Sequence, residues 1–260
     1  MTQEQRLDEL LAYLLAECGG RLPPALEGIT EKKQLFRALM NLRPPRPVTS
    51  AFLSLQDAYL QAENAREGVV PGDQLPTIPS DTRISLWQGD ITRLKVDGIV
   101  NAANSGLLGC FVPLHSCIDN IIHTKSGVAL RLKCAELMRA QGHEEPTGSA
   151  KITPGYNLPC KYVLHTVGPI VQAHLTPEHC TQLGACYRAC LELAAARGLK
   201  SLAFCCISTG VFRFPNERAA QIAIETVQNF LAEDQRLEKV IFNVYKSIDL
   251  AIYRKLLGIR

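Results

Sequence analysis

The hydrophobic positions of the first 66 residues recur at the three- and four-residue spacing of amphipathic helices. The first predicted helix begins at a capping pattern formed by Thr2 and Gln5 and ends at Gly19-Gly20. Two further predicted helices cover residues 31–42 and 50–66. We therefore expect an N-terminal helical extension over residues 1–70. It either packs on the main domain as a cap or offers a docking surface to another protein.

The pattern changes after this extension. Residues 71–82 are rich in proline and glycine, and we interpret them as a connector. From residue 83 to the end, short β-branched runs alternate with helical patterns. Strands are predicted at 84–88, 98–100, 162–166, 202–207 and 239–244, and helices at 127–140, 176–197, 216–231 and 248–257. Such alternation is typical of an α/β sandwich.

Composition narrows the class of protein. A chain of 260 residues with 47% hydrophobic and 20% charged residues has enough apolar side chains for a full core. A net charge of +3 is too small to indicate a nucleic-acid surface. No apolar run approaches the roughly 20 residues that span a bilayer, and residues 1–6 do not resemble a secretory signal. The ten cysteines lie in apolar contexts, so we expect reduced thiols and a cytoplasmic location.

A short loop combines three potential metal ligands, Cys110, His115 and Cys117. Two thiolates and an imidazole form a donor set that suits Zn²⁺. Three protein ligands leave one coordination position open, as in catalytic zinc sites. The alternatives are a closed structural zinc, with His123 or a distant cysteine as the fourth ligand, and no metal at all.

Three other motifs carry polar groups at predicted strand ends. Asp90 lies in a Gly-Asp-Ile-Thr turn, where its carboxylate can accept from an exocyclic amine or only cap the turn. Residues 101–104 (Asn-Ala-Ala-Asn) place two amides after the next strand. Residues 207–215 link a strand to a helix, and such a loop can bind a pyrophosphate through backbone N–H groups. Each motif alone is ambiguous.

In combination these motifs resemble the macrodomain family over about residues 83–258. The resemblance includes G-D-I-T, N-A-A-N, the stretch 147–169, and I-S-T-G-V-F-R-F-P. Most macrodomains follow N-A-A-N with a glycine-rich loop and G-V-D-G-A-I-H, whereas this chain has the Cys/His loop and C-I-D-N-I-I-H. That departure is similar to the zinc-dependent branch, which also carries an N-terminal helical extension. The resemblance implies a three-layer α/β/α sandwich with a mixed central sheet, formed by a macrodomain over residues 83–260.

The resemblance also implies roles for individual residues. The adenine would be bound by Asp90 and Ile91, with Tyr245 as a stacking face or only a surface tyrosine. The diphosphate would be wrapped by Ser208, Thr209, Gly210 and Val211. The distal ribose would lie against Asn104 and Phe212, beside Cys117, Ile118 and Asp119. One zinc per chain would be bound by Cys110, His115 and Cys117, while His123 packs in the following helix. Asn104 and Asp119 would be the catalytic residues, with Asp119 acting on the attacking water.

The function implied by the resemblance is hydrolysis of mono-ADP-ribose from a modified protein side chain. The expected ligands are ADP-ribose and an ADP-ribosylated protein, which in the bacterial branch is linked to lipoyl-carrier proteins. The main alternative is a reader that binds ADP-ribosylated protein without cleaving it. A third hypothesis is hydrolysis of another ADP-ribose ester in the same pocket.

Overall fold

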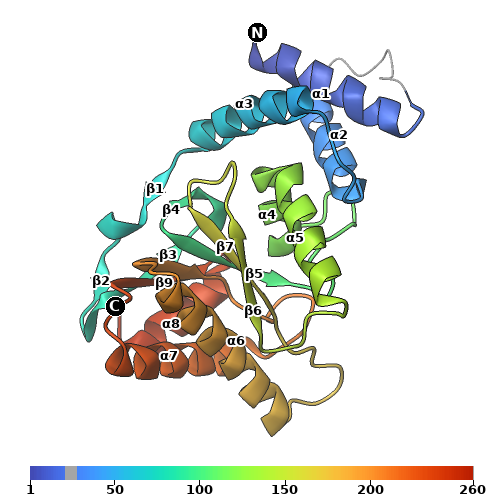
Figure 1. Cartoon of the computed structure of the whole chain (residues 1–260). Helices are drawn as coiled ribbons and strands as arrows, with labels where there is room; N and C mark the ends of the chain where they lie inside the picture. Colours follow the sequence, from blue (N-terminus) through green and yellow to red (C-terminus); the bar gives the residue numbers. More distant parts are fainter. Residues whose placement is uncertain (21–27, 260) are drawn as a thin grey trace.

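The computed structural model describes residues 1–20 and 28–259 (Figure 1). The predicted N-terminal helices are confirmed as α1 (Gln3–Glu17), α2 (Ile29–Leu42) and α3 (Ser50–Glu67). Thr2 and Gln5 form the predicted capping box at the start of α1. The Thr49 hydroxyl caps α3 by accepting from the Phe52 N–H group. Local capping chemistry therefore fixes the starts of α1 and α3, and the sequence indicated the first of these two caps.

The three N-terminal helices have a hydrophobic core of their own. One residue of the main domain, Val128, closes this core. The other members come from the apolar faces of the three helices: Leu7, Leu10, Leu11, Leu14, Phe36, Met40, Phe52, Tyr59 and Leu60. The extension is thus a small helical bundle that packs on the main domain through a shared cluster.

A sheet of seven strands forms the centre of the main domain. Its spatial order is β2 (Thr77–Ile78), β3 (Asp81–Gln88), β9 (Lys239–Val244), β8 (Ser201–Phe204), β5 (Gly98–Ala103), β7 (Tyr162–Val167) and β6 (Ala150–Pro154). The five inner strands are parallel, and the two edge strands are antiparallel to their neighbours. A separate two-stranded pair joins β1 (Val70–Pro71) to β4 (Leu94–Lys95). The sheet is therefore mixed, as predicted.

Helices cover both faces of this sheet. One face is covered by α6 (Pro177–Ala196), α7 (Asn216–Glu233) and α8 (Ser247–Leu257). Helix α7 packs between the other two. On the other side lie α4 (Ile118–Ser126) and α5 (Val128–Gln141), and the N-terminal helices pack outside them (Figure 1). The predicted three-layer α/β/α sandwich is confirmed.

Several elements differ from the sequence prediction. The expected connector, residues 71–82, contains the 3-10 helix η1 (Gly72–Gln74) and β2, together with the end of β1 and the start of β3, so part of it belongs to the sheets. Two-residue strands are too short to leave a periodic pattern. Helix α4 was not predicted, because the predicted helix began at residue 127. In the structure Gly127, with a φ of 94°, divides α4 from α5 without a loop. Edge strand β6 was not predicted, because residues 147–169 were interpreted only as a family motif and not as secondary structure.

The fold also bears on the cysteines and on membrane crossing. We expected Cys186, Cys190, Cys205 and Cys206 to be small hydrophobic side chains of the core. The first three are buried, whereas Cys206 is only partly buried. Across residues 1–20 and 28–259, none of the helices combines the length and the apolar character that crossing a bilayer requires.

Candidate functional site

The predicted site residues follow different strands but converge on one edge of the sheet. Because β3, β9, β8, β5 and β7 are parallel, their carboxyl ends lie at the same edge. These ends are followed by Asp90, Tyr245, the loop 205–215, Asn104 and Gly168. Ligands of open α/β sheets bind in the crevice at this edge. The arrangement supports a single binding site formed by motifs that are more than 150 residues apart in sequence.

The carboxylate of Asp90 forms an ion pair with a lysine of α4. One carboxylate oxygen accepts from the N–H and hydroxyl groups of Thr92 at 2.9 and 2.6 Å. The other oxygen lies 2.9 Å from Nζ of Lys125, at the end of α4. Burial disfavours the charged form, but the Lys125 charge and the Thr92 bonds outweigh it, so the pKa of Asp90 lies below its ordinary value. Asp90 is therefore an anionic acceptor at the start of the 3-10 helix η2 (Ile91–Arg93).

The predicted diphosphate loop has a strained start. Ser208 is buried with φ of 65°, and its hydroxyl oxygen has no hydrogen-bond partner among the described residues. Gly168 lies against it: a Cβ atom at this glycine would fall 2.0 Å from Ser208 Oγ, so only glycine fits. The loop leads into α7, whose N-terminus has no side-chain cap within the described part of the chain. A buried free hydroxyl and an uncapped helix start suit an anionic ligand.

The two predicted catalytic residues form a hydrogen bond with each other. Asn104 donates from Nδ2 to Asp119 Oδ2 at 3.1 Å and to the Gly109 carbonyl at 3.1 Å. Its own side-chain oxygen accepts from the Gly106 N–H group at 3.0 Å. Asn101 donates to the other Asp119 oxygen at 2.8 Å. Two amides of the Asn-Ala-Ala-Asn motif therefore hold the Asp119 carboxylate in one orientation.

Asp119 is a buried carboxylate in the first turn of α4. Burial raises its pKa to about 6, although the Asn101 bond, the Arg131 charge and the Asn104 bond act in the opposite direction. A carboxylate with a pKa near neutral accepts a proton more readily than an ordinary aspartate. The position and the pKa of Asp119 both suit an acid–base group.

The three predicted metal ligands come together in the loop before α4. The donor atoms of Cys110, His115 and Cys117 all lie within 4.8 Å of one another. Cys117 is also the N-cap of α4, and its sulfur accepts from the Asn120 N–H group at 3.4 Å. Burial raises the pKa of the Cys117 thiol to about 11. The clustered soft donors fit a zinc ion, whose binding would displace the thiol proton.

A second group of possible metal donors, His123, Cys134 and His165, lies deeper in the domain. All three are buried, and the two ring nitrogens of His165 are already bonded, to Asn101 at 3.1 Å and to Thr153 at 2.9 Å. Burial holds the pKa of His165 near 4, so its imidazole stays neutral. Because the nitrogens of His165 already have protein partners, this group fits a metal less well than the Cys110 loop. His123 itself is buried within α4, a helix that the sequence analysis did not predict.

The other predicted ligand contacts differ in exposure. Ile91 is buried, whereas Thr209, Phe212 and Ile118 are partly buried. Gly210, Val211 and Tyr245 are exposed, and Tyr245 is 75% accessible. An exposed ring can serve as a stacking face or remain a surface residue, so the role of Tyr245 stays a prediction.

Sequence reasoning did not identify Lys125 or Asn120 as site residues. It gave Asn101 as one of two amides at a strand end, without a role. Asn101 carried a signal, because a polar amide in a buried strand needs a partner. Lys125 and Asn120 lie on α4, which was not predicted as a separate helix. Lys125 forms an ion pair with Asp90, which is distant in sequence. Asn120 contacts the Cys110 loop only because α4 folds back against that loop. No local pattern could have revealed these contacts.

Comparison with known proteins identifies the family of this chain. The sequence model of the macro domain matches residues 100–223. The chain is 51% identical to a protein-ADP-ribose hydrolase of Treponema medium over 264 residues, covering 99% of this chain and all of the relative. It is 50% identical to a protein-ADP-ribose hydrolase of Staphylococcus aureus strain MRSA252, covering 90% of this chain and 86% of that protein.

Solved structures show the same similarity. The Trypanosoma brucei macrodomain in complex with ADP-ribose superposes with a TM-score of 0.67 at 32% identity, covering 85% of this chain and 95% of that one. A point mutant of the Oceanobacillus iheyensis macrodomain with ADP-ribose gives a TM-score of 0.62 at 38% identity, covering 67% and 91%. Both similarities extend over nearly the whole of the solved chains.

Proposed function

This chain belongs to the macro domain family, and we propose that it removes mono-ADP-ribose from modified protein side chains with the help of a zinc ion. The prediction that it is an enzyme is confirmed by hydrolases about half-identical to it over most of its length. Binding of ADP-ribose is supported by the ligand in two related structures. Zinc dependence and the roles of individual residues are our proposals.

The observation that carries the proposed chemistry is the carboxylate of Asp119 held by Asn101 and Asn104 beside the Cys110 loop. In the reaction, water attacks the anomeric carbon of the distal ribose, and the bond to the protein side chain breaks. The ribose gains the hydroxyl group, and the side chain gains a proton. We assign Asp119 to orient and deprotonate the water, and Asn104 to hold the ribose in a reactive position.

Zinc binding is supported by the donor set and its clustering. Cys110, His115 and Cys117 would hold one ion, because their soft donor atoms lie within 4.8 Å of one another. When bound, the ion would supply Lewis-acid polarisation of a ribose hydroxyl. The cluster precedes α4 directly, and Asp119 is two residues beyond Cys117. The proposed metal site and the proposed base therefore belong to one continuous segment.

The rest of the ligand would follow the carboxyl edge of the sheet. Asp90 supplies an anionic acceptor for the adenine amine, and Ile91 offers the neighbouring backbone N–H group. The Ser208–Phe212 loop would wrap the diphosphate. This assignment is supported by the start of α7 and by the Ser208 hydroxyl, which has no hydrogen-bond partner in the described part of the chain. Phe212, which is partly buried, would pack against the distal ribose.

The test is turnover of a mono-ADP-ribosylated protein by the zinc-loaded chain, with release of ADP-ribose measured against the Asp119→Ala variant. Release that depends on Asp119 supports hydrolysis. Tight binding of the modified protein without release, by a zinc-loaded chain, would instead identify a reader. An acetylated ADP-ribose ester, assayed in parallel, tests the third hypothesis, and preferential cleavage of this ester would change the substrate assignment.

The modified partner is proposed from the sequence motifs alone. The motifs predict membership of the zinc-dependent branch, and through this branch a lipoyl-carrier protein as the partner. A cytoplasmic location also remains a prediction, made from the apolar sequence contexts of the ten cysteines. Turnover on a panel of modified carrier proteins and unrelated modified proteins would test the partner directly.

A further inference from the structure

The N-terminal helix α2 contacts the backbone of the proposed metal loop directly. Arg37 donates from Nη2 to the carbonyl oxygen of His115 at 2.6 Å. The side-chain oxygen of Asn41 accepts from the Leu114 N–H group at 3.0 Å. Leu114 and His115 are consecutive residues of the loop, and His115 is one of the proposed ligands. Two polar side chains of the extension therefore fix the backbone at a metal-binding position.

The loop needs such support because its backbone is strained at this point. Leu114 has φ of 59°, in the left-handed region that non-glycine residues rarely adopt. Such a conformation persists only where surrounding contacts hold it. The Asn41 bond satisfies the N–H group of this strained residue. The strained residue directly precedes the proposed ligand His115, and a contact from α2 holds it in place.

Arg37 reaches the rest of the loop through Asn120. The same Nη2 atom donates to Asn120 Oδ1 at 3.1 Å. The buried Asn120 side chain donates in turn to the carbonyl oxygens of Val112 at 3.0 Å and Cys110 at 3.4 Å. The Asn120 N–H group also donates to the sulfur of Cys117. Arg37 and Asn120 together therefore contact the backbone or side chain of all three proposed ligands.

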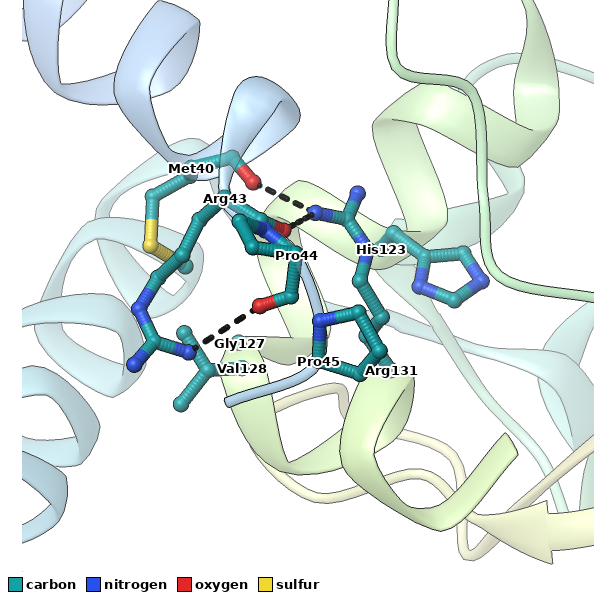
Figure 2. A pocket seen from close by; sticks show the side chains of 8 residues that line it. All are labelled: Met40, Arg43, Pro44, Pro45, His123, Gly127, Val128 and Arg131. Carbon is teal, nitrogen blue, oxygen red and sulfur yellow. Dashed lines mark hydrogen bonds between the residues drawn. The ribbon is translucent and has the colours of Figure 1, made fainter. Parts of the chain in front are cut away.

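Asn41 is fixed at its other end as well. Its Nδ2 donates to the hydroxyl of Thr124 in α4 at 2.9 Å. The end of α2 is held by Arg131 of α5, whose Nη1 donates to the carbonyls of Met40 at 2.9 Å and Asn41 at 3.1 Å. Figure 2 shows this guanidinium against the end of α2, where Met40 and Arg131 line a small pocket. The Arg131 Nε–H group also donates to the carbonyl oxygen of Leu108, just before the metal loop, at 2.7 Å.

We propose that Arg37 and Asn41 are positioning residues of the metal site, so that the N-terminal extension sets the zinc affinity of the main domain. This inference rests on the zinc binding proposed above. A cap that only covers apolar surface would contact the domain through its hydrophobic face. Here α2 also directs an arginine and an asparagine at the backbone of the loop that carries the ligands. Partners outside the ligand shell commonly change metal affinity by about 10- to 100-fold.

The experiment measures zinc affinity in the full-length protein by competition with a chromophoric chelator. The variants are Arg37→Ala, Asn41→Ala and the conservative Asn41→Asp, which keeps an oxygen acceptor for the Leu114 N–H group. Lys33→Ala is the matched control, because Lys33 lies on the same helix but pairs with Glu63 rather than with the loop. Thermal unfolding identifies variants that have lost the fold, and hydrogen exchange reports protection of the Leu114 amide.

We expect Arg37→Ala and Asn41→Ala to bind zinc about 10- to 100-fold more weakly than the wild type, with faster exchange at Leu114. Asn41→Asp should recover part of the affinity, and Lys33→Ala should match the wild type. Folded Arg37→Ala and Asn41→Ala variants with wild-type zinc affinity would overturn this inference while leaving the proposed function intact. A wild-type protein that binds no zinc would overturn the metal site itself, and this inference with it.

Discussion

Asn104 donates a hydrogen bond to Asp119 across 3.1 Å, which joins two residues that the sequence suggested separately as catalytic. Asn104 follows β5, and Asp119 lies in the first turn of α4, on the far side of the Cys110 loop. The amide orients the carboxylate, and the helix start favours its negative charge. The pair is therefore built to keep one carboxylate in place at the edge where the ligand is expected.

Replacing Asp119 tests its proposed role as the base. We expect Asp119→Ala to lower turnover on the order of 10²- to 10⁴-fold, because general-base assistance contributes about that much. Affinity for free ADP-ribose should fall far less, since Asp119 acts on the water. Single-turnover kinetics and calorimetry on the same samples separate the two effects.

The control for this change is Asp73→Ala, which removes an exposed carboxylate in η1. This variant should keep wild-type turnover. If folded Asp119→Ala also kept near-native turnover, the role of the base would belong to another group.

Replacing Asp90 tests the adenine end of the site. The Asp90→Ala variant loses a charged acceptor, and hydrogen bonds to charged groups contribute roughly 1.5–3 kcal/mol. The corresponding loss of ADP-ribose affinity is about ten- to a hundredfold, measured by calorimetry. Unchanged affinity in a folded variant would exclude Asp90 from the binding site.

Lys125 should set the pH range over which Asp90 binds. The pKa of Asp90 is lowered because Lys125 and Thr92 outweigh burial, so Asp90 stays anionic until the pH falls below its ordinary range. In Lys125→Met the Coulomb contribution is lost, and the pKa of Asp90 rises. ADP-ribose affinity of this variant should therefore begin to decline at a higher pH than in the wild type as the solution is acidified.

Calorimetric titrations from about pH 7 down to about pH 2, a range that includes the ordinary aspartate pKa of about 3.9 and the region below it, would measure this shift. Lys133→Met is a suitable control, because Lys133 pairs with Glu136 on the surface of α5 rather than with Asp90. Parallel pH profiles for wild type and Lys125→Met would show that Lys125 does not control Asp90.

Removal of the metal distinguishes a catalytic zinc from a structural one. With three protein ligands and an open position, we expect about one zinc per purified chain. Cys117→Ala or chelator treatment should abolish turnover while the domain stays folded. ADP-ribose should still bind through its adenosine end, because Asp90 and the Ser208 loop lie outside the metal loop.

The decisive measurement combines thermal unfolding and turnover on one chelator-treated sample. Collapse of the fold after zinc removal would indicate a structural metal. Full turnover by the metal-free protein would contradict the catalytic assignment, and readdition of zinc controls for damage by the chelator.

The sequence by itself determined the features that depend on local patterns. The Thr2–Gln5 capping box, the three helices of the extension and the main strands follow from short-range chemistry and periodicity. The Cys110, His115 and Cys117 cluster was also readable, because one short loop contains all three donors and brings them close in space. Motif order along the chain was enough to indicate the macro domain.

Only the tertiary structure decided how these pieces act together. The Lys125–Asp90 ion pair, the two amides on Asp119, and the bonds from Arg37 and Asn41 to the metal loop each join residues on separate elements. Such contacts depend on parallel strands ending at one edge and on the docking of α2 against α4. Periodicity cannot report them, because it describes which face of an element is buried and not which partner that face meets.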